Sequence, residues 1–344
     1  MKSTAAKKRA PARTKKVPVR EAYRTPKGRM LVGRIEDALK NSALNASRGK
    51  VNLIFTSPPF PLVRKKRYGN ETGKTYLRWL ESLAPEMCDM LAPGGSIVIE
   101  IGNSWEPGVP VMSTLGLEAL LAFKRAGDLN LCQQVICHNP ARLPSPAQWV
   151  NINRERLKDS FTHVWWMSRE VHPKANNRRV LLPYSYHMKG LLKSQKYNAG
   201  VRPSGHVISN HGFLTDHGGS ISPNVISLTD DATLPESLLK FSGTSADIRY
   251  RQYCKEHGYE THPARMQMGL AGFFIEFLTE PGDLVLDPFG GSNTTGYAAE
   301  TLERRWLSVE ASEEYALGSK GRFEGEEKAK RVSTKKPLGG RRAA

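Results

Sequence analysis

The sequence lacks the patterns that mark several common protein classes. Its 344 residues include only four cysteines (Cys88, Cys132, Cys137 and Cys254), and none forms a C-x-x-C pair or has the spacing of zinc ligands. We therefore expect neither a disulfide scaffold nor a structural metal site, and we expect a reducing compartment. No apolar run approaches the roughly 18 residues of a membrane helix, and no apolar stretch follows the basic N-terminus as it would in a secretory signal.

Two nucleotide-binding motifs are also missing. The chain has no G-x-G-x-x-G and no complete G-x-x-x-x-G-K-[ST], which argues against a dinucleotide-dependent dehydrogenase and a P-loop NTPase. With 39% hydrophobic and 24% charged residues, the composition instead fits one large or two small globular domains.

Acidic residues are absent from the outermost segments at both ends of the chain. Residues 1–20 carry eight Lys or Arg and residues 328–344 carry seven, so residues 21–327 hold only +3 of the net charge of +18. These segments contain few large apolar side chains, and we expect disordered tails over residues 1–26 and 319–344. The tails either aid solubility or contact the phosphates of a nucleic acid.

A third acid-free stretch lies inside the chain. Residues 171–215 contain no Asp or Glu, but they contain seven Lys or Arg and four His, with tyrosines between them. Such a stretch suits a polyanion, because each phosphate that it neutralises releases condensed counterions. The alternative is a cationic insertion without a function of its own.

Strand-like and helix-like segments alternate on both sides of this stretch. Buried strands are predicted at 51–56, 96–101, 130–138, 283–287 and 306–309, and helices at 72–91, 112–126, 265–278 and 294–303. This alternation predicts a mostly parallel sheet with helices on both faces. Between about 172 and 260 the pattern gives way to Gly, Ser, Asn and His, which indicates a second module.

A glycine-rich turn provides the clearest cofactor signal. In residues 286–296, LDPFGGSNTTG, a strand ends in Asp287, glycines follow, and a helix begins behind them. Free N–H groups at such a helix start can bind a ligand, and an acid before the glycines suits one with a positively charged amino-acid portion, as in S-adenosylmethionine. Glu310 ends the next strand, where a Rossmann-like unit places the acid that binds the ribose hydroxyls.

A second motif, Thr56-Ser57-Pro58-Pro59-Phe60, also follows a strand. The two prolines lack N–H groups and stiffen the chain, which leaves carbonyls as acceptors. The Ser57 hydroxyl and the Pro58 carbonyl can together accept both hydrogens of an exocyclic amine, and Phe60 offers a face on which an aromatic base can stack. These contacts favour the pyramidal, nucleophilic nitrogen in the transition state of methyl transfer. Attack at a cytosine ring carbon would need a thiolate, usually presented as Pro-Cys, and no cysteine here follows a proline.

Together these two motifs resemble the DNA amino-methyltransferases of restriction–modification systems, in the permuted (beta) order in which the catalytic motif precedes the cofactor motif. Further similarity lies in residues 91–98, in Trp149 with the basic segment up to Trp165-Trp166, and in His262-Pro263-Ala264-Arg265. The resemblance covers residues 30–316 and excludes both tails. Serine before Pro-Pro and phenylalanine after it resemble the cytosine-N4 members more than the adenine-N6 members.

The resemblance implies a Rossmann-like, S-adenosylmethionine-dependent α/β sheet with an inserted target-recognition module. Residues 27–171 would form the catalytic half, 172–260 the target-recognition region and 261–318 the cofactor-binding half. The implied catalytic residues are Ser57, Pro58, Pro59 and Phe60. The implied cofactor-binding residues are Asp287, Phe289, Gly290, Gly291, Ser292, Thr294, Glu310, His262, Pro263 and Asp37, the last beside the adenine ring.

Double-stranded DNA is the expected partner, and because the amine lies inside the duplex the target base must be flipped out. The expected DNA-binding residues are Arg64, Lys65, Lys66, Arg67, Lys174, Arg178, Arg179, Lys189 and Lys193, although 64–67 also fit a solvated loop. A cognate restriction endonuclease would be a functional counterpart, and no stable complex with it is implied. We expect this protein to be cytoplasmic and associated with DNA, and to be encoded by a prokaryote or a phage. Two alternatives stay open: adenine-N6 methylation by the same fold, and a nucleic-acid-binding protein whose core is inactive or RNA-directed.

Overall fold

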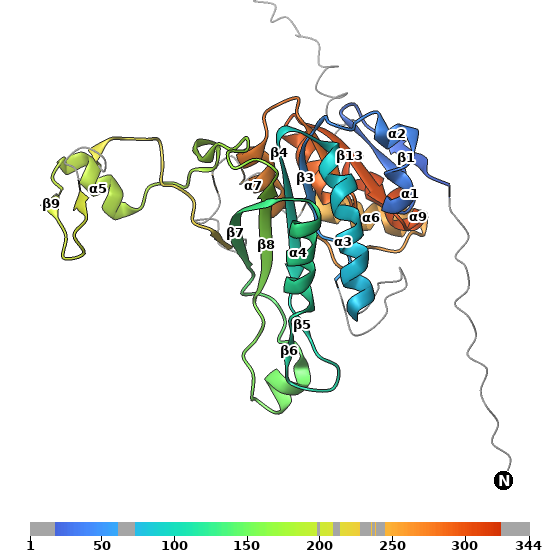
Figure 1. The fold of residues 1–344 in the computed structure, drawn as a ribbon, viewed down its shortest axis with the longest axis horizontal. Coiled ribbons are helices and arrows are strands. Elements are labelled where there is room, and N and C mark those ends of the chain that lie inside the picture. Colours follow the sequence, from blue (N-terminus) through green and yellow to red (C-terminus); the bar gives the residue numbers. More distant parts are fainter. Residues whose placement is uncertain are drawn as a thin grey trace, which may run out of the picture.

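The computed structural model describes residues 18–60, 73–197, 200–208, 214–227, 235, 238 and 245–324, and its centre is one large sheet (Figure 1). Nine strands lie in the order β1-β2-β13-β12-β3-β4-β8-β7-β11. Neighbours from β2 to β4 pair in parallel, whereas β8 runs antiparallel to β4 and β7. The strands are β1 Arg20–Arg24, β2 Gly28–Val32, β3 Val51–Thr56, β4 Leu91–Gly102, β7 Asn130–His138, β8 Phe161–Ser168, β11 Val225–Ser227, β12 Leu284–Asp287 and β13 Arg305–Glu310.

Helices cover both faces of this sheet, as the alternation predicts. One face packs against α1 (Ile35–Ala38), α3 (Gly73–Met90) and α4 (Leu115–Ala126), and the other against α7 (Met268–Leu278), α8 (Thr294–Thr301) and α9 (Glu313–Ser319). The remaining short elements are α2 Ser42–Asn45, β5 Ser104–Trp105, β6 Met112–Ser113, a π-helix Gln148–Ile152, 3₁₀ turns Asn177–Val180 and Lys320–Arg322, α5 Tyr186–Ser194, β9 Gly200–Val201, β10 Val207–Ile208 and α6 Ser245–His257. Among the described residues, no helix combines the length and apolarity needed to cross a membrane.

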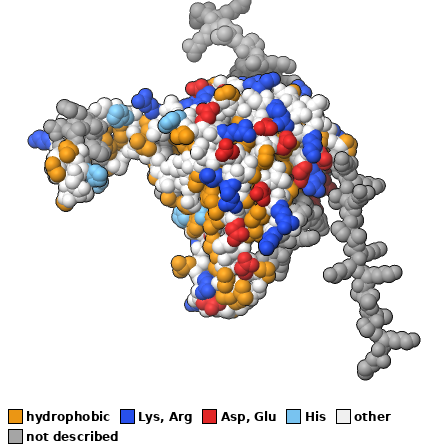
Figure 2. Space-filling view, viewed as in Figure 1, with side chains coloured by type: hydrophobic (Ala, Val, Ile, Leu, Met, Phe, Trp, Pro, Cys, Tyr) orange, Lys and Arg blue, Asp and Glu red, His pale blue; other side chains and the backbone are white. Residues whose placement is uncertain are grey.

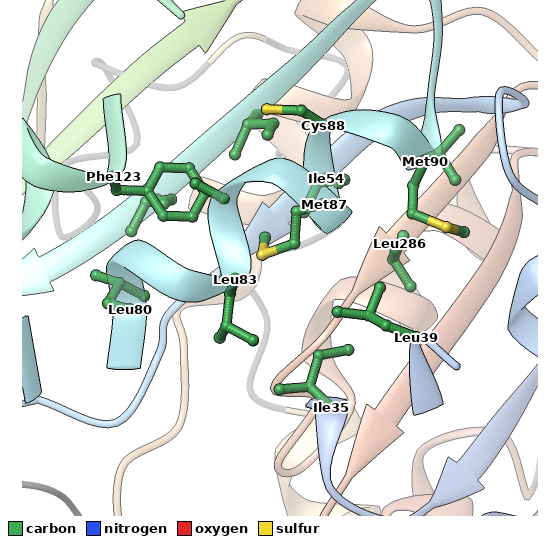
Figure 3. Packing of buried hydrophobic residues seen from close by; sticks show 14 of the residues in the cluster. Ile35, Leu39, Ile54, Leu80, Leu83, Met87, Cys88, Met90, Phe123 and Leu286 are labelled. Atoms are coloured by element: carbon green, nitrogen blue, oxygen red, sulfur yellow. The ribbon is translucent and has the colours of Figure 1, made fainter. Parts of the chain in front are cut away.

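The sheet separates two hydrophobic cores, because successive side chains along each buried strand point to opposite faces. In β4, Ile97, Ile99 and Ile101 face the α3 and α4 side, whereas Val98 faces the α7 side. A strand with helices on both faces is apolar on both sides, which explains why Ile97, Val98 and Ile99 are consecutive hydrophobic residues. Figure 3 shows Leu83 and Met87 of α3 among the buried residues of the first core.

An arm leaves the body between Leu182 and Ser220, which pair with each other through two backbone hydrogen bonds of 2.8 Å. It carries α5, β9 and β10, and it extends away from the sheet in Figure 1. Lysine, arginine and histidine side chains lie along it in Figure 2. The acid-free stretch of the sequence therefore corresponds largely to a projecting structure.

Three predicted boundaries need correction. The N-terminal tail does not reach residue 26, because β1 begins at Arg20 and pairs with β2. The C-terminal tail does not begin at residue 319, because the side chain of Arg322 is fully buried. Residues 172–260 are not one separate region: β11 joins the edge of the main sheet, and Tyr250 and Cys254 of α6 are buried against the body. Each of these segments is fixed by contacts with residues distant in sequence.

Candidate active site

The parallel strands bring both sequence motifs to one edge of the sheet. The carboxyl ends of β3, β4, β12 and β13 meet there, and a cavity of about 640 Å³ opens beside them. Ligands bind at this edge in open α/β sheets. Residues that line the cavity include the predicted Ser57, Pro58, Pro59, Phe60, Asp287, Phe289, Gly290, Gly291, Ser292, Thr294, Glu310 and His262.

Asp287 joins the two motifs directly. Its carboxylate accepts hydrogen bonds from Thr56 Oγ1 (2.7 Å), Thr295 Oγ1 (2.7 Å) and the Phe289 backbone N–H (3.0 Å). Burial raises the pKa of Asp287, although these three donors act in the opposite direction. The acid before the glycines therefore holds the β3 end, the turn and the start of α8 in one arrangement.

The glycine turn is shaped by close approach. Gly291 has a φ of +50°, and a Cβ atom there would lie 3.3 Å from His262 Nε2. The following Asn293 also has a positive φ, and its side chain caps α8 by accepting from the Gly296 N–H. A larger side chain at position 291 would be strained and would displace His262 from the cavity wall.

Glu310 lies at the end of β13 beside this turn. Its carboxylate accepts from the backbone N–H groups of Gly291 and Ser312, each at 2.8 Å. Burial raises the pKa of Glu310. Each oxygen keeps a further lone pair, so the carboxylate can also accept hydrogen bonds from a diol in the cavity.

Sequence reasoning missed the residue that holds the turn from behind. Arg322 donates from Nε to the Ser292 carbonyl (2.6 Å) and from Nη2 to Ser292 Oγ (3.0 Å), and Nη1 lies 2.8 Å from Asp247 Oδ1. Asp247 also pairs with Arg265 at 3.2 Å, and Arg265 lines the cavity. Nothing in the sequence around Arg322, which lies near the basic tail, indicates that it contacts the glycine turn.

The acid near the start of the domain differs from the predicted one. Glu36, not Asp37, lines the cavity, and it accepts a 2.7 Å hydrogen bond from Trp79 Nε1. The Trp79 and Phe289 rings lie 5.5 Å apart on the same cavity wall. Pro263 is likewise outside the lining, although His262 and Ala264 on either side of it belong to it.

The other half of the cavity surrounds Ser57. Phe60 packs so closely on Gly102 that a Cβ atom at position 102 would lie 2.8 Å from its ring. Glu100, a partly buried residue of β4 that sequence reasoning missed, lines the cavity with Ser57 and accepts a hydrogen bond from Thr162 Oγ1 (2.9 Å). Burial raises the pKa of Glu100. The antiparallel pairing of β4 with β8 brings Thr162 to this site.

Comparison with known proteins decides the family. Residues 51–320 match the DNA methylase family N6_N4_Mtase. This chain belongs to that family. Type II methyltransferase M.PvuII of Proteus hauseri is 39% identical over 304 residues, covering 88% of this chain and 85% of the relative. Type II methyltransferase M.HindIII of Haemophilus influenzae is 24% identical over 272 residues, covering 78% and 77%. The solved PvuII DNA methyltransferase (cytosine-N4-specific) matches with a TM-score of 0.65 at 32% identity, covering 91% of this chain and 94% of that chain.

The predicted DNA-binding residues of this methylase lie in different surroundings. Arg64, Lys65, Lys66 and Arg67 fall outside the described residues. Lys174 lies 2.7 Å from Asp283 and 2.8 Å from Glu280, and Arg179 donates to the Thr279 carbonyl, so both anchor the base of the arm to the body. Arg178 is exposed, as are Lys189 and Lys193 on α5.

Proposed function

We propose that this methylase transfers a methyl group from S-adenosylmethionine to the exocyclic N4 amine of a cytosine flipped out of double-stranded DNA. The observation that carries the proposal is the juxtaposition, in one cavity, of the Ser57-Pro58-Pro59-Phe60 segment with the glycine turn and Glu310. The 39% identity to M.PvuII and the match to a cytosine-N4-specific structure support the choice of base.

The residues around Ser57 suit an amine substrate. Glu100 lines the cavity with Ser57, and a hydrogen bond donated by the Ser57 hydroxyl to its carboxylate would leave the lone pairs of the hydroxyl oxygen available to accept from the amine. The Pro58 carbonyl provides a second acceptor, so both amine hydrogens can be held. Because the amine lone pair is delocalised into the ring, these two acceptors help most in the transition state, where the nitrogen becomes pyramidal.

The other half of the cavity suits the methyl donor. S-adenosylmethionine supplies the methyl group as part of an electrophilic sulfonium. Glu310 would accept from the ribose hydroxyls, and the aromatic side chains of Trp79 and Phe289, which line the cavity, would hold the adenine ring. The close approach of His262 to Gly291 covers the remaining part of the turn. Holding donor and amine in line supplies much of the catalysis without a covalent enzyme intermediate.

A cysteine in the cavity lining does not change this assignment. Cys137 of β7 lines the cavity, but burial raises the pKa of its thiol to about 12, so the nucleophilic thiolate is scarce at neutral pH. Ring-carbon methylation, which needs a thiolate, is therefore disfavoured on structural as well as sequence grounds. Target recognition is assigned to the arm, which projects from the body (Figure 1). Its exposed Lys189 and Lys193 offer phosphate contacts that would position the protein on DNA.

Methyl transfer to duplex DNA tests the proposal. Purified protein is incubated with labelled S-adenosylmethionine and plasmid DNA of mixed sequence, and the DNA is digested to nucleosides. We expect N4-methylcytosine. N6-methyladenine instead would assign the rival base, and labelled RNA but not DNA would assign an RNA-directed core. No transfer to any nucleic acid would contradict the proposal.

A further inference from the structure

Arg142 lines the same cavity as Ser57. It follows β7 in the connection to β8, and Asn139, Phe161 and Thr162 from the ends of the same two strands line the cavity with it. They share this lining with Ser57 and Pro58, which must contact the amine of the proposed base.

One end of the Arg142 guanidinium is fixed by the protein. Its Nη1 donates to the Phe161 carbonyl (3.0 Å) and lies 3.2 Å from Asp159 Oδ2. Asp159 is itself held, because Asn103 Nδ2 donates to its other oxygen at 2.8 Å. Within the described part of the chain, Nε and Nη2 of Arg142 form no hydrogen bond. The anchored group therefore keeps donors available on its remaining nitrogens.

Cytosine and adenine differ at the position that such donors recognise. Both bases carry the amine next to a ring-nitrogen acceptor, N3 in cytosine and N1 in adenine. Beyond that nitrogen, cytosine has the carbonyl O2, whereas adenine has a C–H group. A donor fixed at this position would pair with cytosine and would be left unpaired by adenine.

We propose that Arg142 donates a hydrogen bond to O2 of the flipped cytosine and so favours cytosine over adenine at the target position. The proposal rests on the proposed function. A phosphate contact is the competing role, but the Asp159 carboxylate already compensates the Arg142 charge, and 34% of the side chain is exposed. A phosphate would be bound better by an arginine that has no acidic partner than by this anchored one.

The test compares duplexes with and without the target base. DNA affinity is measured for wild type and Arg142→Met, with S-adenosylhomocysteine present, on a cognate duplex and on the same duplex with an abasic target position. We expect the substitution to weaken binding of the cytosine duplex roughly 5- to 100-fold, as for loss of a base-edge contact, and binding of the abasic duplex less than twofold. In single-turnover methylation, the ratio of cytosine to adenine transfer should fall by a similar factor.

Controls separate this role from others. Arg156→Met removes an exposed arginine of the same loop that donates to the Pro110 carbonyl, and it should leave the cytosine-to-abasic ratio unchanged. Arg142→Lys keeps a charge but loses the planar fork, which provides a second variant if Arg142→Met is unstable. Equal losses on both duplexes with a reduced salt dependence would identify a phosphate contact and overturn the proposal, as would no loss on either. Absence of cytosine methylation by wild type would instead contradict the proposed function.

Discussion

Ser57 and Glu310 lie in different halves of one cavity, so their roles should separate in kinetics. We expect Ser57→Ala to lower the rate of methyl transfer by ~100-fold or more, because the hydroxyl accepts from the amine in the transition state. S-adenosylmethionine affinity should stay within a few-fold of wild type. Single-turnover kinetics and calorimetry measure the two quantities.

Glu310→Ala is the matched control. Loss of this carboxylate should weaken S-adenosylmethionine binding by roughly 10- to 100-fold, since a hydrogen bond to a charged group contributes about 1.5–3 kcal/mol. Methyl transfer at saturating donor should fall much less. A Ser57→Ala protein that lost donor binding but kept its rate would contradict the assignment of the two halves.

The Glu100 carboxylate is expected to lower the folding stability at high pH, although methyl transfer depends on it. Burial raises its pKa in the folded protein, so the unfolded chain releases this proton at lower pH than the folded chain does. Its contribution to folding stability is therefore lost as the pH rises from the unfolded-state pKa of about 4.3 through the higher folded-state pKa. Glu100→Gln should melt at a higher temperature than wild type at pH 8 and at a similar temperature at pH 4, while methyl transfer decreases.

Asp287 and Glu310 have raised pKa values as well, but they are present in both proteins and cancel in this comparison. Thermal melting from pH 4 to 8 measures the difference directly. A variant less stable than wild type at every pH would show that the hydrogen bond from Thr162 to the carboxylate outweighs the cost of burying the charge.

At the scale of elements, the sequence predicted what depends on local pattern. The strands on either side of the two motifs, the long helix α3 and the helices on both faces all appear where periodicity placed them. The family was also predicted, and it is confirmed by the match over residues 51–320. Each of these features depends on a continuous stretch of sequence, in which the spacing of apolar and glycine residues indicates the local structure.

Features that depend on distant partners were not predictable in this way. The pairing of β8 with β4 brings Thr162 to Glu100. The local sequence of neither strand indicates that the two strands are neighbours. Arg322 donates to Ser292, thirty positions earlier in the sequence, and β13 and α9 lie between them in the chain. A buried arginine in an otherwise basic, polar segment has the same local sequence as a solvated one.

Removal of the arm tests whether cofactor binding and target recognition belong to different parts of the structure. Leu182 and Ser220 already pair at its base, so a short glycine turn can replace residues 183–219 while this backbone bridge is kept. None of the arm residues that the structure describes lines the cavity. We therefore expect the shortened protein to bind S-adenosylmethionine with near-normal affinity and to lose site-specific DNA methylation.

Calorimetry with the donor and methylation of plasmid DNA distinguish the outcomes for the shortened protein. A matched control replaces Lys189, Lys193 and Lys196 by alanine in the intact arm. It should weaken DNA binding without abolishing site preference, because phosphate contacts position the protein whereas base contacts specify the sequence. Retained site preference after removal of residues 183–219 would place recognition elsewhere.

At the scale of the whole molecule, the distribution of charge matters more than its sum. Residues 1–17 and 328–344 each contain seven Lys or Arg and no acid, and both lie outside the described residues. Arg20 has a different role, because it pairs with Glu313 of α9 in the folded body. A truncation that tests the tails must therefore stop before β1.

We expect removal of residues 1–17 and 328–344 to weaken binding of cognate and scrambled duplexes by the same factor. If the tails contact phosphates, a plot of log affinity against log salt should lose about 0.9 units of slope for each contact removed. Site preference should persist, because the arm and the cavity remain intact. Affinity measured against salt for full-length and truncated protein checks this, with melting temperature as the control for folding. Equal slopes would make the tails solubility extensions, and a lost site preference would show that recognition depends on them.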